Sequence, residues 1–220
     1  MNIERIQTLV DGFADKRVAV VGDLMIDRYI WGSASRISQE APVPVVAVER
    51  ETTAPGGAAN VLRNLSSLGA APLAFGVLGD DSAGEELSSL LDEHGVDTSG
   101  LLFDSGRITT EKMRIIADHQ QVVRVDLERV EPIREDNVDA IVSGIEEAIA
   151  SDGLDAIIVE DYDKGMVTES LLVGVAELGK RHEIPVALDP HPGNHASAQG
   201  ITILTPNRSE AFAMAGFYQK

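Results

Sequence analysis

The segment Arg17-Val18-Ala19-Val20-Val21-Gly22-Asp23 is apolar, rich in β-branched residues and free of alternating polar positions. This pattern is typical of a strand that is buried on both faces, as in a parallel sheet. Similar apolar runs occur at 73–78, 156–159, 186–188 and 201–204. We therefore predict a buried strand at each of these positions.

Amphipathic helical patterns lie between these runs. In the range 58–68, for example, Val61, Leu65 and Leu68 fall on one apolar stripe. The other ranges with helical spacing are 3–13, 84–94, 135–150 and 168–181. Strands that alternate with helices indicate βαβ units, so we predict an α/β fold whose mostly parallel sheet is covered by helices.

Two segments depart from this alternation. Residues 43–50 follow a proline-containing loop and have the pattern of an exposed strand. Residues 109–116 and 121–127 form the two arms of a predicted hairpin, and the second arm alternates apolar residues with Arg124 and Asp126. We expect these strands to form a separate small sheet beside the main α/β body.

Length and charge exclude several classes of protein. The 220 residues, 44% of them hydrophobic, suit one globular domain, with at most a small appendage. With 18 basic and 36 acidic residues the net charge is −18, which disfavours binding to nucleic acids or to anionic membranes. There is no cysteine, no apolar run long enough to span a bilayer and no signal-peptide core, so we expect a cytoplasmic protein.

A glycine-rich motif precedes the helix predicted at 58–68. Gly56 and Gly57 allow a ligand to approach the backbone closely, and the helix start presents N–H groups to an oxygen-rich ligand. Asn60, in the first turn, can both donate to and accept from a sugar hydroxyl. The alternative is a tight loop followed by close helix packing.

Carboxylates follow several of the predicted strands, at the edge where α/β sheets bind ligands. Asp27 comes after the first strand and is able to accept hydrogen bonds from two adjacent hydroxyls. Glu160, Asp161 and Asp163 follow the strand at 156–159 and are suited to positioning a cation or polarising a hydroxyl. Asp189, before a proline, ends the next strand. The alternative is that these residues cap or solvate loops.

The last motif is Thr205-Pro206-Asn207-Arg208-Ser209-Glu210. Asn207 fits a helix N-cap, and Glu210 three residues later resembles a capping box. The same pair also places an amide and a carboxylate where a hydrated Mg²⁺ ion and a phosphate can sit. The sequence contains no nucleophile elbow, no Walker motif and no dinucleotide-binding glycine fingerprint, which disfavours a dinucleotide-binding Rossmann enzyme.

The order of these motifs resembles the ribokinase (PfkB) family of sugar kinases. Within that family, the segments 21–29, 35–45 and 55–61 are similar to the D-glycero-β-D-manno-heptose-7-phosphate kinase subgroup, often the N-terminal domain of a bifunctional heptose kinase and adenylyltransferase. The resemblance implies a ribokinase-like three-layer α/β/α domain over residues 1–220. It also implies a small β-sheet lid, with strands at about 28–54 and 107–128.

The activity that the resemblance implies is transfer of the γ-phosphoryl group of ATP, with Mg²⁺, to the anomeric hydroxyl of a heptose 7-phosphate. The product is the 1,7-bisphosphate. Alternatives are a kinase for another sugar, such as a fructose phosphate or a nucleoside, and a non-catalytic protein that binds a sugar phosphate. A homodimer through the lid sheet is a further expectation.

The resemblance also assigns residues to roles. On the acceptor side, Asp27, Gly56, Gly57 and Asn60 would hold sugar hydroxyls and Asp161 would lie near them. The lid would offer cations to the substrate phosphate, the candidates being Lys112, Arg114 and Arg124. Asn207 and Glu210 would organise Mg²⁺ through water together with the triphosphate, and Asp189 would belong to the nucleotide side.

Two features depart from the family pattern. His191 stands after Asp-Pro where the subgroup usually has a lysine, which replaces a permanent cation by an imidazole that is mostly neutral at pH 7. The family's Gly-Ala-Gly-Asp motif, which supplies the anion hole and the catalytic base, occurs nowhere in the 220 residues. We therefore assign no catalytic residue in this chain and expect a missing C-terminal part, with little kinase turnover by the chain alone.

Overall fold

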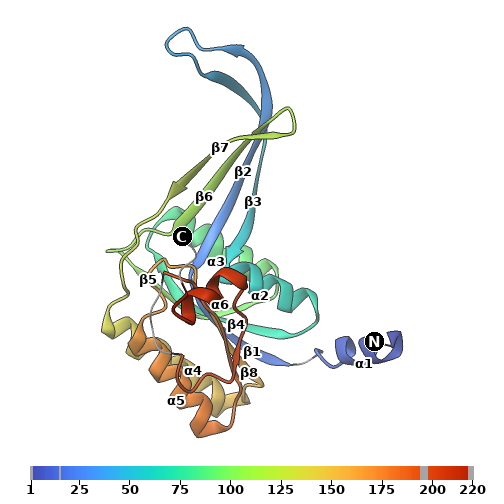
Figure 1. Ribbon diagram of the computed structural model, residues 1–220, viewed down its shortest axis with the longest axis vertical. Helices are drawn as coiled ribbons and strands as arrows, with labels where there is room; N and C mark the ends of the chain where they lie inside the picture. The colour runs from blue at the N-terminus through green and yellow to red at the C-terminus, as the bar shows by residue number, and fades with distance from the viewer. Residues whose placement is uncertain (1, 15, 194–197, 218–220) are drawn as a thin grey trace.

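The computed structural model describes residues 2–14, 16–193 and 198–217, which form two sheets and their covering helices (Figure 1). The strands are β1 (Arg17–Gly22), β2 (Leu24–Ile37), β3 (Pro44–Gly57), β4 (Ala71–Gly79), β5 (Asp97–Asp104), β6 (Thr110–Ala117), β7 (Gln120–Leu127), β8 (Ala156–Glu160), β9 (Val186–Asp189) and β10 (Ile203–Leu204). The helices are α1 (Ile3–Asp11), α2 (Ala58–Ser67), α3 (Ser82–Glu93), α4 (Glu135–Asp152), α5 (Glu169–His182) and α6 (Arg208–Met214).

The main sheet has the strand order β10-β9-β8-β1-β4-β5, and its neighbouring strands all pair in parallel. The carboxyl ends of these strands therefore meet at one edge. The central strand β1 is buried along nearly its whole length, because helices cover both faces of the sheet around it.

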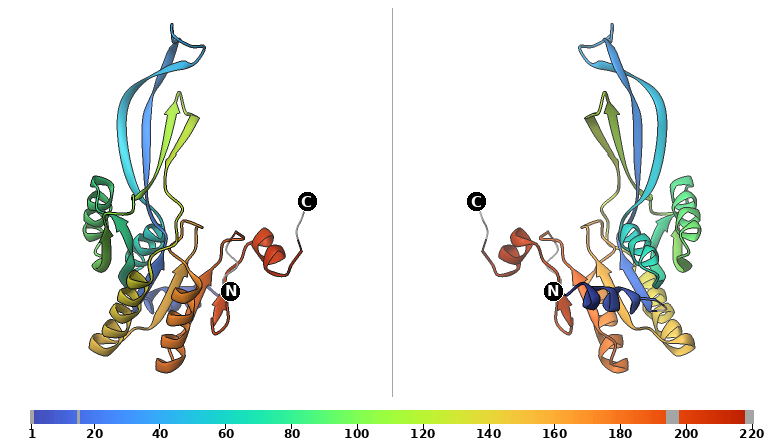
Figure 2. Two further views of the ribbon diagram at one scale, coloured as in Figure 1. Left: turned by 90° about the vertical axis from the view of Figure 1, so that its left-hand side faces the viewer. Right: turned by 90° about the vertical axis from the view of Figure 1, so that its right-hand side faces the viewer.

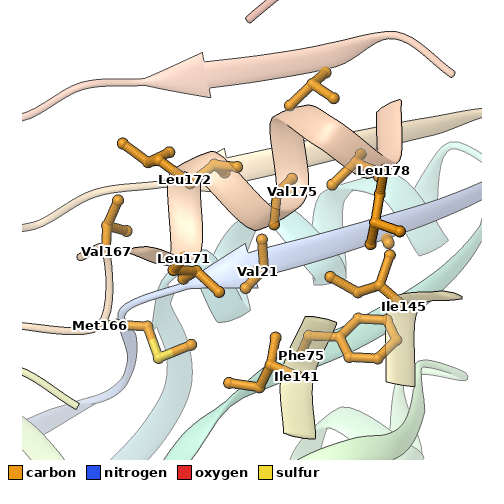
Figure 3. Packing of buried hydrophobic residues seen from close by; sticks show 14 of the residues in the cluster. Val21, Phe75, Ile141, Ile145, Met166, Val167, Leu171, Leu172, Val175 and Leu178 are labelled. Carbon is orange, nitrogen blue, oxygen red and sulfur yellow. The ribbon is translucent and has the colours of Figure 1, made fainter. Parts of the chain in front are cut away.

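Two hydrophobic clusters hold the layers together. On one face, side chains of β1, β4, β8 and β9 pack against α4 and α5 (Figure 3). On the other face, side chains of β1 and β4 pack against α2 and α3. Complete burial of one such Leu or Ile side chain contributes about 1.5–3 kcal/mol. The three-layer α/β/α arrangement predicted from the sequence is therefore confirmed.

The second sheet, here called the lid sheet, has the order β3-β2-β6-β7 and rises away from the helical body (Figures 1 and 2). Its strands β2 and β3 are 14 residues long each and pair antiparallel, whereas β2 and β6 pair in parallel. The hairpin predicted at 109–127 is formed by β6 and β7. The predicted small sheet is therefore present.

Four strands differ from the sequence prediction. Strand β2 was expected only as part of a lid range and β5 was not predicted, because both mix polar and apolar residues. Strand β3 continues past residue 50 to Gly57, so the two glycines of the motif end a strand and do not lie in a separate loop. Strand β10 is limited to Ile203 and Leu204, both exposed at the edge of the sheet.

Helix α1 forms where the sequence predicts it, but none of its residues is buried. Its apolar residues Ile3, Leu9 and Val10 are exposed, although Leu9 and Phe13 line an apolar groove against β1, α2 and β8. Within the described residues, no helix is long and apolar enough to cross a membrane.

Candidate functional site

The candidate site begins at the root of the lid sheet. Asp27 lies in β2, between Ala54 of β3 and Lys112 of β6. Its carboxylate accepts a hydrogen bond from Arg114 Nη1, with 2.5 Å between Nη1 and Oδ1. A Cβ atom built on Gly56 would lie 2.8 Å from Asp27 Oδ2, so the carboxylate rests directly on the backbone at Gly56. The structure thus brings Asp27, Gly56 and Arg114 together.

Gly57 joins this strand to helix α2. It has φ +55°, a region that side chains with a Cβ rarely adopt. A Cβ there would lie 2.5 Å from the carbonyl oxygen of Asp23, and that same oxygen accepts a hydrogen bond from Ala58 N at 3.0 Å. Only glycine therefore lets the chain pass from β3 into α2 so close to the end of β1.

Asn60 lies in the first turn of α2 and is partly buried. Its Oδ1 atom accepts a hydrogen bond from Arg63 Nη2 at 2.7 Å. The side-chain amide nitrogen of an asparagine carries two hydrogens that can be donated to a ligand hydroxyl. The position three residues after Gly57 puts Asn60 beside the glycines at the start of the helix.

Acidic side chains of the main sheet face the same region. Because side chains alternate along β8, Glu160 projects from the opposite face to Val159, which packs in the α4–α5 cluster. Tyr162 follows directly, and its pKa is raised by burial and by the charges of four nearby carboxylates, Glu160, Asp189, Asp23 and Asp27. Tyr162 therefore lies near acidic residues from β2, β8 and β9 and near Asp23, which follows β1.

Glu160 was named in the sequence analysis as one of three carboxylates after the strand at 156–159, but no substrate-binding role was predicted for it. Glu160 is 6% exposed, and burial together with the charge of Asp189 raises the pKa of its carboxyl to about 7. The register pairs Glu160 with Asp189 across β8 and β9. The apolar run of β8 shows no alternation in the sequence, so the structure is needed to separate Glu160 from Asp161.

The raised pKa of Glu160 predicts a pH dependence of stability. Between pH 4.5 and 7 the folded protein binds a proton at Glu160 that the unfolded chain releases, so the free energy of unfolding falls as the pH rises. Glu160→Gln is expected to flatten this slope in thermal unfolding measured from pH 4.5 to 8. Asp23, whose pKa burial also raises, is present in both proteins and cancels in the difference. Parallel curves for the two proteins contradict the prediction.

Asp161 is the first residue after β8. Together with Asp163 it lines a cavity of about 600 Å³ bounded by the starts of α4 and α5. Its Oδ1 atom accepts a hydrogen bond from Asp163 N at 2.9 Å, and its own backbone N donates to Asp189 O. Glu160 is not among the residues that line this cavity.

The cations of the lid lie on the face that carries Asp27. Arg114 of β6 lies directly opposite Arg124 of β7, and Lys112 lies opposite Asp126. Arg124 Nε donates to Asp126 Oδ1 at 2.8 Å, while the Arg114 guanidinium also stacks over Tyr29. The repulsion between these two like charges is offset by Asp27, which pairs with Arg114, and by Asp126, which pairs with Arg124.

The motif at 205–210 takes the local structure that its capping pattern predicts. Asn207 caps α6 and forms a capping box with Glu210, whose Oε2 accepts from Asn207 N at 2.6 Å. The other Glu210 oxygen contacts Asn207 Nδ2. Asp189 Oδ1 accepts from Thr205 Oγ1 at 2.9 Å, which ties this segment to β9. Across the described part of the chain, no group of three or more acidic or histidine residues is arranged to hold a metal ion.

His191 lies close to the acidic loop after β8. Its Nδ1 atom accepts a hydrogen bond from Gly193 N at 3.1 Å and lies 3.7 Å from Asp163 Oδ2. The Nδ1 atom is therefore already used by the backbone of its own loop. Phosphate contact by residue 191 is therefore not supported by its local bonding.

Comparison with known proteins identifies relatives over most of the chain. A family model described as "pfkB family carbohydrate kinase" matches residues 15–219. The chain is 44% identical over 199 residues to the bifunctional protein HldE of Wolinella succinogenes, covering 90% of this chain and 42% of that protein. It is 43% identical to the same-named protein of Desulfatibacillum aliphaticivorans, covering 98% and 44%. The chain thus spans less than half the length of these relatives.

Solved structures agree with this assignment at the level of the fold. A carbohydrate kinase from Agrobacterium tumefaciens superposes with a TM-score of 0.68 at 23% identity, covering 91% of this chain and 64% of that one. Ribokinase of Arabidopsis thaliana, solved with ribose and ATP, superposes with a TM-score of 0.62 at 18% identity, covering 92% and 63%. Because the family model covers nearly the whole sequence, the chain belongs to the pfkB family of carbohydrate kinases.

Proposed function

We propose that this chain is the acceptor-binding part of an ATP-dependent sugar kinase that acts on D-glycero-D-manno-heptose 7-phosphate. The observation that carries the proposal is the placement of the Asp27 carboxylate between the backbone at Gly56 and the guanidinium of Arg114. This arrangement offers an anionic acceptor for sugar hydroxyls next to a lid cation for a phosphate. The similarity to proteins named HldE supports a heptose phosphate over other sugars.

The charge of the site suits a polyhydroxylated ligand. Asp27, Glu160 and Asp189 surround Tyr162 and accept hydrogen bonds, whereas sugar hydroxyls donate them. Hydrogen bonds to a charged group contribute about 1.5–3 kcal/mol each. In this proposal Asp27 receives two adjacent hydroxyls, and Gly57 and Asn60 hold further hydroxyls at the start of α2.

The phosphate of the substrate is assigned to the lid. Arg114 and Arg124 face each other across β6 and β7, and Lys112 lies two residue pairs further along, on the same face. A guanidinium binds phosphate oxygens through two parallel N–H bonds, so both arginines are suited to the phosphate beside their partners Asp27 and Asp126. The 7-phosphate would therefore lie at the end of the sugar that points into the lid.

ATP and Mg²⁺ are the proposed phosphoryl donor and its counterion. Asn207 and Glu210 present an amide and a carboxylate at the start of α6, but both Glu210 oxygens already contact Asn207. They therefore fit a hydrated Mg²⁺ through bridging water, without direct coordination. When bound, Mg²⁺ neutralises charge on the triphosphate.

The proposed reaction breaks the bond between the γ-phosphorus and the β–γ bridging oxygen of ATP. A new bond forms from the anomeric oxygen to the γ-phosphorus, and the hydroxyl proton passes to a base. The family's base lies in a Gly-Ala-Gly-Asp motif, which the 220 residues do not contain. We expect the chain by itself to release ADP at least about 100-fold more slowly than a relative with the motif, since a general base contributes about 10²–10⁴-fold.

A cytoplasmic location and a homodimer through the lid sheet belong to the same proposal. Strand β7 exposes Val123, Val125 and Leu127, which alternate with the polar residues of the site-facing side. Such an apolar sheet face is suited to pairing with a second copy. Light scattering coupled to gel filtration would show twice the chain mass, and a monomer at high concentration contradicts the dimer.

The proposed function is tested by isothermal titration of the purified chain. Heptose 7-phosphate is expected to bind, the unphosphorylated heptose to bind at least tenfold more weakly, and ATP to bind more weakly than the sugar phosphate. Equal affinity for the phosphorylated and unphosphorylated sugars contradicts the lid assignment. Tighter binding of a fructose phosphate or of a nucleoside contradicts the heptose assignment.

A further inference from the structure

Asp23 is a buried carboxylate that the proposed function does not use. It follows β1 at the centre of the main sheet and is 3% exposed. Three backbone N–H groups donate to its side chain: Tyr162 N to Oδ2 at 2.8 Å, Lys164 N to Oδ2 at 3.2 Å and Met166 N to Oδ1 at 3.1 Å. The segment 161–166, here called the acceptor loop, is therefore wrapped around this one carboxylate.

The backbone of Asp23 connects the same loop region to the glycine motif. Its N–H donates to Glu160 O at 3.1 Å, and its carbonyl accepts from Ala58 N at 3.0 Å. A single residue thus holds the end of β8, the acceptor loop and the start of α2. These are the elements that carry Glu160, Tyr162 and Asn60.

The acceptor loop has an irregular backbone. Asp163 has φ +57° and Gly165 has φ +89°, so two of its six residues are in the left-handed region. A non-glycine residue in that region costs of order 1–3 kcal/mol and persists only where the surroundings determine it. The three hydrogen bonds from the loop to the Asp23 carboxylate hold the loop in this conformation.

The acceptor loop also contacts both ends of the lid hairpin. Arg107, just before β6, donates to Lys164 O at 2.7 Å, and Lys164 Nζ donates to Glu128, just after β7, at 3.1 Å. The position of the loop is therefore transmitted to the strands that carry Arg114 and Arg124. A displacement of the loop from Asp23 would move both the acidic and the cationic parts of the site.

From these contacts we propose that Asp23 is a positioning residue that fixes the acceptor loop relative to helix α2 and the lid. The effect on sugar binding rests on the proposed function, whereas the attachment of the acceptor loop to Asp23, here called the anchor, depends only on the fold. Asp23 is not assigned a catalytic role, because its carboxylate is buried and accepts three backbone N–H groups. It acts on substrate only through Tyr162, Glu160 and the lid.

The test compares Asp23→Asn with Asp155→Asn as a matched control. Asp155 also accepts a backbone N–H, from Arg17 at 2.9 Å, but it lies at the opposite end of β1. An asparagine at 23 keeps one acceptor oxygen and turns an amide donor toward the loop N–H groups. Hydrogen exchange followed by mass spectrometry and titration with heptose 7-phosphate are measured on both variants.

In Asp23→Asn we expect exchange in peptides covering 161–166 to accelerate at least tenfold, with β1 and α5 unchanged. Heptose 7-phosphate affinity should fall about 10–100-fold, while Asp155→Asn keeps both wild-type values. Unchanged exchange or affinity in Asp23→Asn, or equal losses in the two variants, would overturn the proposal. If the wild-type chain binds no sugar phosphate, the proposed function is wrong. The hydrogen-exchange rates of residues 161–166 still test whether Asp23 holds the acceptor loop.

The wild-type protein provides a second measurement if Asp23→Asn does not fold. The amide hydrogens of Tyr162, Lys164 and Met166 should exchange as slowly as those of β8, although they lie in a loop. Exchange at the rate of an exposed loop would show that the anchor does not hold in solution and would overturn the proposal.

Discussion

Asp27→Asn is expected to weaken the binding of heptose 7-phosphate about 100-fold. The carboxylate is proposed to receive two sugar hydroxyls, and loss of charge from such a pair costs about 2–3 kcal/mol, where 1.4 kcal/mol is a factor of ten in affinity. The substitution also removes the anionic partner of Arg114, which lies 2.5 Å away. Isothermal titration of the sugar phosphate measures the effect.

Asp126→Asn is the control for this prediction. Asp126 lies on the same lid sheet and accepts a hydrogen bond from Arg124 at 2.8 Å, but no sugar hydroxyl is assigned to it. Its replacement should change the affinity less than tenfold. If Asp27→Asn binds the ligand as tightly as wild type, Asp27 is not part of the acceptor site and the proposed function loses its main support.

Gly57→Ala is expected to lower the free energy of unfolding by about 4 kcal/mol, through backbone strain and steric overlap together. The added Cβ would lie 2.5 Å from Asp23 O and 2.7 Å from Met25 Cε, at a residue with φ +55°. Since the free energy of unfolding of a domain is only about 5–15 kcal/mol, this loss is a large fraction of the total. Urea unfolding followed by circular dichroism measures the loss.

Gly153→Ala separates the two causes of that loss. Gly153 also has a positive φ, +75°, but a Cβ there meets nothing within 4 Å. It should therefore cost only the backbone strain, about 1–3 kcal/mol. Equal losses at Gly57 and Gly153 would mean that the contact with Asp23 does not constrain the chain.

The layered fold could be predicted because its signals are local. Burial is indicated by the local residue pattern in each element, as in the apolar runs at 17–23 and 156–159 and the helical stripe at 58–68. Their alternation fixes a parallel sheet without any knowledge of strand order. The lid hairpin was predicted for the same reason, since the alternation around Arg124 is visible within eight residues.

The rest of the site depends on contacts that are distant in sequence. Strand β2 was not predicted as a single strand because both of its faces mix polar and apolar residues, and it is stabilised by pairing with β3 and β6. Asp23 appears in the sequence as an ordinary loop residue, yet its partners lie 139 to 143 positions away. Glu160 could be distinguished from Asp161 only by the face of β8 from which each projects.

The position of β1 at the middle of the main sheet has a consequence for synthesis of the protein. One of its neighbours, β4, begins at Ala71, but the other, β8, begins only at Ala156. At roughly 5–20 residues per second, a ribosome needs roughly 7–30 s to make the intervening chain after β1 emerges. During that interval the central apolar strand of the nascent polypeptide has one unpaired edge, and unpaired strand edges make a folding chain prone to aggregation.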